Sequence, residues 1–265
     1  MDIIGNFKIF EGGNALKFSR DILRSEVEPT LSDFLEESAA LLGLCENDFV
    51  RIGSAGEAEA SADIDLCVLN IDLKTLHELV REKLGHLESR VMPGVGVVSI
   101  GYPIANDPHG YVQLDLIPVV NRDWCDFIFG RPVGSKYKSA HRNWLISSIL
   151  SCLRDNLSED VYRGYSLRLG SGVYLVEKSY VGKTKRLKNP IKIKEEFFTA
   201  EPYELMRLAF GPTITMSDVS TFEGAYAAVC SESFRWPDIR SNVMDECASR
   251  LKKAGLILPE ELKQI

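Results

Sequence analysis

Several common features of functional sites and of cellular targeting are missing from the sequence. None of the six cysteines belongs to a C-x-x-C pair, which argues against a zinc site or a disulfide framework. The chain has no apolar stretch long enough to cross a membrane, and its beginning, MDIIGNFKIF, lacks the pattern of a signal peptide. Internal repeats and low-complexity segments are also missing. We therefore expect a globular cytoplasmic protein without membrane contact, whose cysteines are free thiols.

The chain also lacks the excess of positive charge that is typical of proteins that coat nucleic acid. Its formal net charge is −7, so any contact with RNA or another polyanion should be a local patch. Its 265 residues are 45% hydrophobic and 26% charged, as in a protein with a hydrophobic core in one large domain or two small ones. The sequence does not indicate an oligomeric state.

The periodicity of apolar residues changes along the chain. Up to about residue 133, helical segments alternate with short strand-like runs, at 48–54, 62–70, 95–104 and 110–120. Beyond it most segments have helical periodicity, and one β-hairpin is expected around residues 170–172. We therefore predict an α+β fold with two domains. A domain with a mixed β-sheet and flanking helices (1–133) precedes a mainly helical domain that carries a hairpin (134–265).

Aspartates occur within two of the strand-like runs, where this residue is uncommon. Asp63 and Asp65 in ADIDLCVLN are two residues apart, so they lie on the same face of their strand. Asp115 lies between two leucines in VQLDLIP. If the two strands are neighbours, three carboxylates meet, and they all stay ionised only if positive charge lies between them. Mg²⁺ or Mn²⁺ would suit oxygen ligands; aspartates that merely solvate a strand edge are the alternative.

A glycine and a serine precede this pair of aspartates. Gly53 permits a tight turn and a close approach of the main chain to a ligand. Ser54 is placed to cap a short helix in AGEAEAS (55–61), whose free N–H groups would favour a phosphate. Together with the carboxylates, the turn predicts a site for a metal-chelated triphosphate, and two such ions form the usual clamp for phosphoryl chemistry. A plain turn is the alternative.

These residues resemble the motif of the DNA polymerase β-like nucleotidyltransferase superfamily: a G-S pair, a D-x-D on a strand after eight residues, and a later strand aspartate. The resemblance covers about residues 49–118. It implies a nucleotidyltransferase-like fold and a two-metal transferase that moves a nucleotidyl group from an NTP to a hydroxyl or phosphate acceptor, with release of pyrophosphate. Gly53 and Ser54 match the triphosphate turn, Asp63 and Asp65 match the residues that hold both metals, and Asp115 matches the third carboxylate.

The resemblance leaves the subgroup, the NTP and the acceptor open. The segment KYKSAHRNWL (136–145) and a later FG pair are similar to nucleotidyltransferase-like proteins of bacteriophages. ATP binding is among the expected properties, and the acceptor is RNA, a protein or a small molecule. The alternative function is a catalytically inactive nucleotide-binding or interaction module with the same fold.

Two groups of basic residues are further candidates for binding. Lys138 and Arg142, four residues apart at the start of a predicted helix, are candidates for contacting the triphosphate, or alternatively the acceptor. Residues 178–194 contain seven lysines and arginines and no acidic residue, which would suit contacts to the backbone of a nucleic-acid acceptor. Solvated surface cations are the alternative for both groups.

Overall fold

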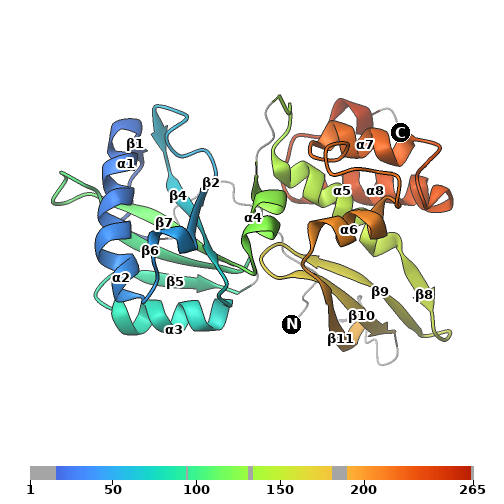
Figure 1. Ribbon diagram of the computed structural model, residues 1–265, viewed down its shortest axis with the longest axis horizontal. Coiled ribbons are helices and arrows are strands. Elements are labelled where there is room, and N and C mark those ends of the chain that lie inside the picture. The colour runs from blue at the N-terminus through green and yellow to red at the C-terminus, as the bar shows by residue number, and fades with distance from the viewer. Residues whose placement is uncertain (1–15, 94, 131–133, 181–189, 264–265) are drawn as a thin grey trace. The chain divides into compact units, whose positions relative to one another are not determined.

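The structure is a computed structural model that describes residues 16–93, 95–130, 134–180 and 190–263 (Figure 1). These residues belong to two compact units, one that ends at Cys125 and one that begins at Asp126. Each unit has its own main β-sheet, and the first of these sheets is mixed, so the prediction of a mixed α/β chain is confirmed. None of the described helices is long and apolar enough to span a membrane. The predicted domain boundary after residue 133 stays a prediction.

The first unit is built on a five-stranded sheet in the order β2-β4-β7-β6-β5. Strands β4 and β7 are parallel, and the other neighbouring pairs are antiparallel. The four predicted strands of this half are present, and β1, β3 and β5 are additional. The elements are β1 (Ile22–Leu23), α1 (Arg24–Asp33), η1 (Phe34–Ser38, a π-helix), α2 (Ala39–Leu41), η2 (Glu46–Asp48), β2 (Phe49–Ile52), β3 (Ala60–Ser61), β4 (Asp63–Leu69), α3 (Leu73–Lys83), β5 (Ser89–Met92), β6 (Val97–Pro103) and β7 (Tyr111–Val119).

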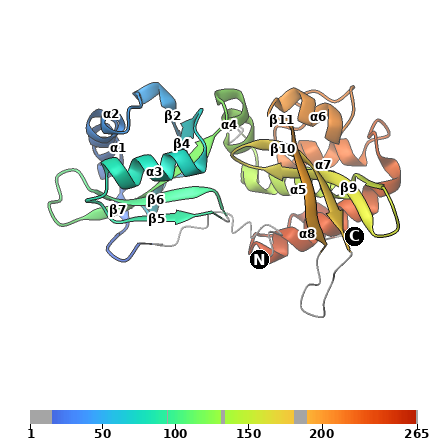
Figure 2. The same ribbon diagram turned by 90° about the horizontal axis from the view of Figure 1, so that it is seen from below.

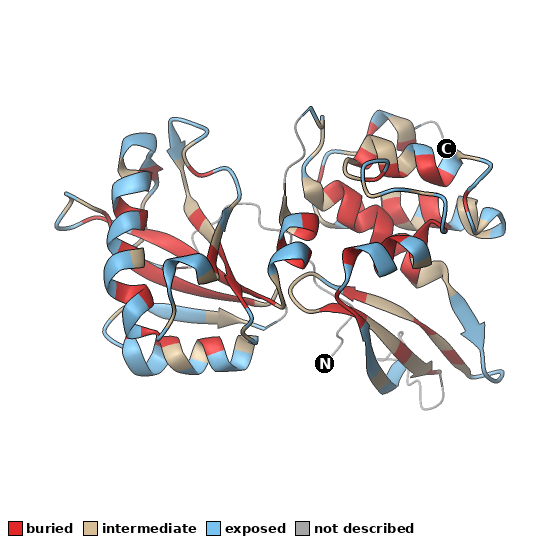
Figure 3. Cartoon of the chain, in the orientation of Figure 1, coloured by how far each residue is buried: buried red, intermediate tan, exposed pale blue. Residues whose placement is uncertain are grey.

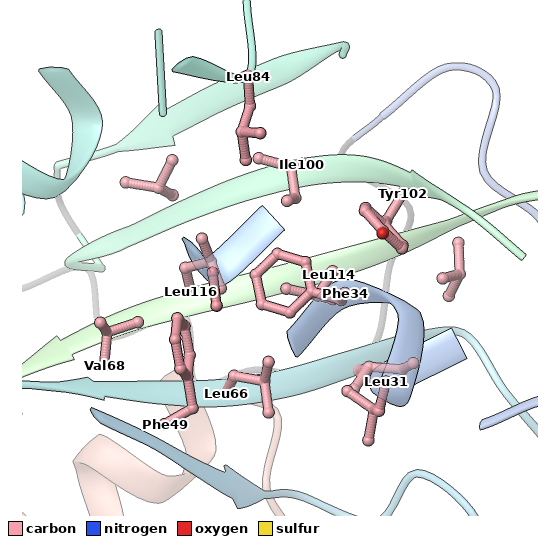
Figure 4. Close-up of a cluster of buried hydrophobic side chains, with 14 of the residues drawn as sticks. Leu31, Phe34, Phe49, Leu66, Val68, Leu84, Ile100, Tyr102, Leu114 and Leu116 are labelled. Atoms are coloured by element: carbon pink, nitrogen blue, oxygen red, sulfur yellow. The ribbon is translucent and has the colours of Figure 1, made fainter. Parts of the chain in front are cut away.

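One face of this sheet carries the hydrophobic core. Figure 2 shows α1, α2 and α3 on the same side of β5, β6 and β7, and Figure 4 shows Phe34 among Leu66, Leu114 and Leu116. Full burial of a leucine or phenylalanine contributes about 1.5–3 kcal/mol. Because side chains alternate along a strand, burying Ile64 and Leu66 directs their neighbours Asp63 and Asp65 to the opposite face. The core therefore fixes the direction of these carboxylates, since a slip of one residue would bury them in it.

The second unit contains an antiparallel sheet in the order β11-β10-β9-β8. Strands β9 and β10 form a hairpin where one was expected, but β8 and β11 extend it to four strands, so a mainly helical unit is not confirmed. Helix α4 (Arg122–Phe129) crosses the boundary between the units. The other elements are α5 (Ser139–Cys152), β8 (Arg154–Asn156), β9 (Val161–Arg168), β10 (Gly172–Ser179), β11 (Ile191–Thr199), α6 (Pro202–Ala209), α7 (Phe222–Cys230), η3 (Pro237–Ile239), α8 (Arg240–Lys253) and η4 (Glu260–Leu262).

Helix α5 is the central helix of the second unit. It packs against α7, α8 and β9, and every residue from His141 to Leu150 is buried (Figure 3). A helix that is buried on all sides has to hydrogen-bond its polar side chains internally. This requirement applies to Arg142 and Asn143, and it bears on the predicted role of Arg142 below.

Candidate functional site

The three aspartates singled out in the sequence meet in the first unit. In the parallel pairing of β4 with β7, Asp65 lies opposite Asp115, and Asp63 lies opposite Gln113. One carboxylate oxygen of each aspartate lies within 4.8 Å of those of the other two. The two strands that carry the aspartates are therefore neighbours, as the sequence interpretation required. The role of the aspartates as metal ligands stays a prediction at this point.

Burial makes the ionised form of this cluster unfavourable. Asp115 is 2% exposed, and Asp63 and Asp65 are half-buried. Burial, reinforced by the charges of the other two aspartates, raises the pKa of Asp65 to about 8. Burial also raises the pKa of Asp115 to about 6, although the polar side chains of Ser99 and Gln113 lower it in part. The pKa of Asp63 is raised by burial and by the charge of Asp21. In the absence of a cation, the cluster therefore holds protons close to neutral pH.

The hydrogen bonds of the cluster leave acceptor capacity for a cation. Gln113 Nε2 donates to both carboxylate oxygens of Asp115, at 3.1 and 3.2 Å. Asp65 Oδ1, in contrast, is buried and has no hydrogen-bond partner among the described residues. A buried polar atom without a partner costs about 1–3 kcal/mol. Three carboxylates without a nitrogen or sulfur donor are the ligands that hard divalent ions such as Mg²⁺ or Mn²⁺ prefer. The residues present therefore fit such an ion.

The main chain at Gly53 packs closely against one of these carboxylates. Gly53 has a φ of +72°, in the left-handed region, and a Cβ atom added to it would overlap Asp65 Oδ2. It directly follows Ile52, which pairs with Asp65 across β2 and β4. A glycine is therefore needed at this position both for its backbone conformation and for the approach of the turn to the carboxylate.

The helix predicted in residues 55–61 is wrong. These residues form a turn, in which the Glu57 N–H donates to the Ser54 carbonyl at 3.0 Å, followed by β3, which pairs with β1. Gly56 has a φ of +81°, which right-handed helix excludes. Arg51 stabilises the turn, because its guanidinium donates a hydrogen bond to the Ala55 carbonyl. The same guanidinium forms an ion pair with Glu28 of α1. Ser54 therefore caps no helix, and a phosphate contact would have to come from the turn itself.

The basic residues predicted to contact the triphosphate belong to the second unit. Lys138 is the exposed residue before α5. Arg142 is 2% exposed and donates to the main-chain carbonyls of Ser220, Phe127 and Ile128, with its guanidinium 4.6 Å from the centre of the Phe127 ring. Burial lowers the pKa of Arg142 to about 10. These contacts give Arg142 a structural role, and its nucleotide contact, like that of Lys138, stays a prediction.

The basic run 178–194 is only partly described. Lys183, Lys185 and Arg186, at its centre, lie outside the described residues. Lys192 forms an ion pair with Glu195, and Lys194 forms one with Glu196, at 2.5 and 2.6 Å. These glutamates lie just beyond the run, so its far end is not as purely basic in space as it is in sequence.

Sequence reasoning overlooked two residues that shape the site, Gln113 and Arg51. Gln113 lies two residues before Asp115 and therefore on the same face of β7, which is a signal that strand periodicity supplies. The contacts of Arg51 had no such signal, because one depends on the conformation of the turn at Ala55 and the other joins it to Glu28, which is 23 residues away in the sequence.

Comparison with solved structures finds the Cid1 poly(U) polymerase. One of its crystal structures is 15% identical, with 55% of this chain and 59% of that chain covered and a TM-score of 0.28. A second is 12% identical over 79% and 66%, and a third, with MgGTP bound, is 13% identical over 80% and 70%; both have a TM-score of 0.30. The chain thus spans 59–70% of the length of these three structures. No protein family and no curated protein matches the sequence. TM-scores this low do not establish a common fold, so the function has to be argued from the site.

Proposed function

We propose that this chain is a metal-dependent nucleotidyltransferase of the DNA polymerase β-like superfamily. It would transfer a nucleotidyl group from an NTP to a hydroxyl or phosphate acceptor and release pyrophosphate. One observation carries the proposal: Asp63, Asp65 and Asp115 lie on adjacent strands with ligand oxygens within 4.8 Å of one another. Burying three carboxylates together is unfavourable without a counter-charge, and it is the arrangement that a site for divalent ions requires.

The residues of the chain can be assigned distinct tasks in this reaction. Asp63 and Asp65 would hold both ions, and Asp115 would hold the ion nearer the acceptor. Mg²⁺ or Mn²⁺, when bound, would lower the pKa of the acceptor hydroxyl and stabilise the charge that develops on the transferred phosphoryl group. Gln113 orients the Asp115 carboxylate by donating to both of its oxygens. Gly53, which lacks a side chain, lets the turn approach the Asp65 carboxylate closely, and the main chain of this turn would contact the triphosphate.

The proposal is tested by pyrophosphate release from each of the four NTPs, with RNA, protein and small-molecule fractions of a cell lysate offered as acceptors. We expect release by the wild type only when Mg²⁺ or Mn²⁺ is present. Asp115→Asn should lower it by at least about 100-fold, since even residues that only support metal ligands are worth 10–100-fold. Asp238→Asn is the matched control, because Asp238 is an exposed aspartate in the other unit.

Two results would contradict the proposal. If Asp115→Asn released pyrophosphate as fast as the wild type, the carboxylate site would not be the catalytic site. If the wild type bound MgATP in a calorimetric titration but released no pyrophosphate with any NTP and acceptor fraction, the chain would be the inactive nucleotide-binding module instead.

A further inference from the structure

Positive side chains gather on one face of the sheet in the second unit. Lys178 on β10 lies opposite Tyr162 on β9 and opposite Lys192 on β11. Residues that lie opposite each other in antiparallel strands point to the same face, with Cβ atoms about 4.5–5.5 Å apart. Arg154 of β8 stacks on the Tyr162 ring, with its guanidinium carbon 5.0 Å from the ring centre. Arg154, Lys178 and Lys192 are called the cationic row below.

The charge of the cationic row is only partly compensated. Lys192 is paired with Glu195 at 2.5 Å. Arg154 donates to the Ser151 carbonyl at 2.7 Å and forms no ion pair with a carboxylate in the described part of the chain. Asp155, the acidic residue next to Arg154, lies opposite Arg163 in the register of β8 with β9. Its side chain is therefore on the other face of the sheet. The positive charge of Arg154 is therefore not paired with a described carboxylate on the face of the sheet that carries the cationic row.

Lys178 is the least compensated member of the row. Its side chain is half-buried, and its ammonium group forms neither a hydrogen bond nor an ion pair with any other described residue. From the helix layer it faces Arg250 of α8, whose own partner is Glu246 at 2.8 Å. Burial, and then the charges of Arg154, Arg250 and Lys192, lower the pKa of Lys178, and Glu195 offsets them only in part. A half-buried lysine with like charges beside it destabilises the fold unless a further anion joins it.

We propose that the cationic row is a binding site for phosphate groups. Arg154 and Lys192 are exposed, Lys178 is half-buried, and the three cations come from three different strands of the sheet. Neighbouring strands are about 4.8 Å apart, so the cations are spread over more width than a single phosphate covers. This geometry favours the successive phosphates of a nucleic-acid strand over one inorganic phosphate. The claim that the cationic row binds phosphate groups is independent of the proposed function. The further claim that these phosphates belong to the acceptor of the transferase rests on the proposed function.

The test measures the binding of a labelled single-stranded RNA 12-mer to the full chain. Binding is monitored by fluorescence anisotropy, in a buffer that contains EDTA and no NTP. Lys178→Met and Arg154→Met should each weaken binding by about tenfold, as expected for the loss of one charge-assisted contact. Each should also reduce the slope of log affinity against log salt by about 0.7. Lys178→Met should raise the melting temperature of the free protein at the same time, because it removes a half-buried cation.

Lys194→Met is the matched control, since Lys194 lies on β11 opposite Glu177, on the other face of the sheet, and is paired with Glu196. It should bind RNA like the wild type. Because the assay contains EDTA and no NTP, a failure of the proposed chemistry does not affect the result. Competition with inorganic pyrophosphate separates the two sources of phosphate: a strand site requires a large excess of pyrophosphate to displace RNA, and a site for free phosphate does not. The proposal is overturned if the wild type binds neither, if Lys178→Met and Arg154→Met bind like the wild type, or if Lys194→Met loses as much affinity.

Discussion

Replacement of Gly53 by alanine tests whether the turn and the carboxylate cluster form one site. Gly53 has a φ of +72°, and a left-handed conformation costs a non-glycine residue about 1–2 kcal/mol. Gly43, in the same unit, has a φ of +73°. A Cβ added at Gly43 meets nothing within 4 Å, whereas at Gly53 it overlaps Asp65 Oδ2. Gly43→Ala therefore carries the same backbone strain without the collision, and it is the matched control.

Backbone strain alone should cost each variant about 1–2 kcal/mol in free energy of unfolding, which lowers the melting temperature by roughly 2–8 °C in a chain of this size. Only Gly53→Ala should also lose affinity for Mn²⁺. Its methyl group either displaces the Asp65 carboxylate or forces a shift of the turn, and overpacking of this kind adds about 1–3 kcal/mol. Displacing one of three carboxylate ligands should weaken Mn²⁺ binding by at least about tenfold.

The measurement is a titration with Mn²⁺, in which the signal of the free ion is followed by electron paramagnetic resonance, beside thermal unfolding of the same samples. Binding of Mn²⁺ by Gly53→Ala as tight as that by Gly43→Ala would refute the link between turn and cluster. If both variants lost Mn²⁺ affinity equally, general strain in the unit would explain the loss, and the close approach of Gly53 to Asp65 would have no functional meaning.

Two further predictions concern charge. Asp65→Asn should abolish pyrophosphate release and stabilise the metal-free protein at pH 8. The pKa of Asp65 is raised to about 8 in the folded protein, against about 3.9 in an unfolded chain, so its stabilising effect is complete below about pH 4 and is lost as the pH rises to about 8. Urea unfolding between pH 5 and 8 should therefore show a decline in stability that is smaller in Asp65→Asn, and equal slopes would contradict the assignment. Arg142→Lys should lower the free energy of unfolding by about 2–4 kcal/mol, because a lysine cannot donate hydrogen bonds to all of the same buried carbonyls. The KM for NTP should stay the same. A raised KM at unchanged stability would instead support the predicted nucleotide contact.

The carboxylate cluster could be predicted from the sequence because side chains alternate between the two faces of a strand. A spacing of two residues places Asp63 and Asp65 on one face, and the apolar residues between and beyond them require that face to point away from the core. The sequence did not state which strand lies next to β4. That Asp115 lies beside Asp65 depends on the parallel pairing of β4 with β7, which is a property of the topology and not of either segment.

The predicted helix at 55–61 failed because tertiary contacts outweighed local propensity. Alanine and glutamate favour helix by a few tenths of a kcal/mol per residue. Against this, the left-handed Gly56, the contact of Arg51 with Ala55 and the pairing of β3 with β1 all hold the segment in another conformation. Strand β11 was missed for a different reason. Its register shifts twice against β10, so its sequence, IKIKEEFFT, shows no sustained alternation.

Arg142 and Lys178 show why a positive charge in a sequence does not by itself mark a binding site. Both side chains are at least half-buried. The Arg142 guanidinium donates hydrogen bonds to three carbonyls of its own unit, and the Lys178 ammonium donates none to the described residues. Neutralising Arg142 would leave buried acceptors without donors and lower stability. Neutralising Lys178 removes a charge that the described residues compensate only in part, through Glu195. The same distinction applies to Asp65, whose buried oxygen also lacks a partner among the described residues. Neutralising a charged group that stabilises the fold should therefore lower the free energy of unfolding. Neutralising a charged group whose partner is a ligand should raise it in the ligand-free protein.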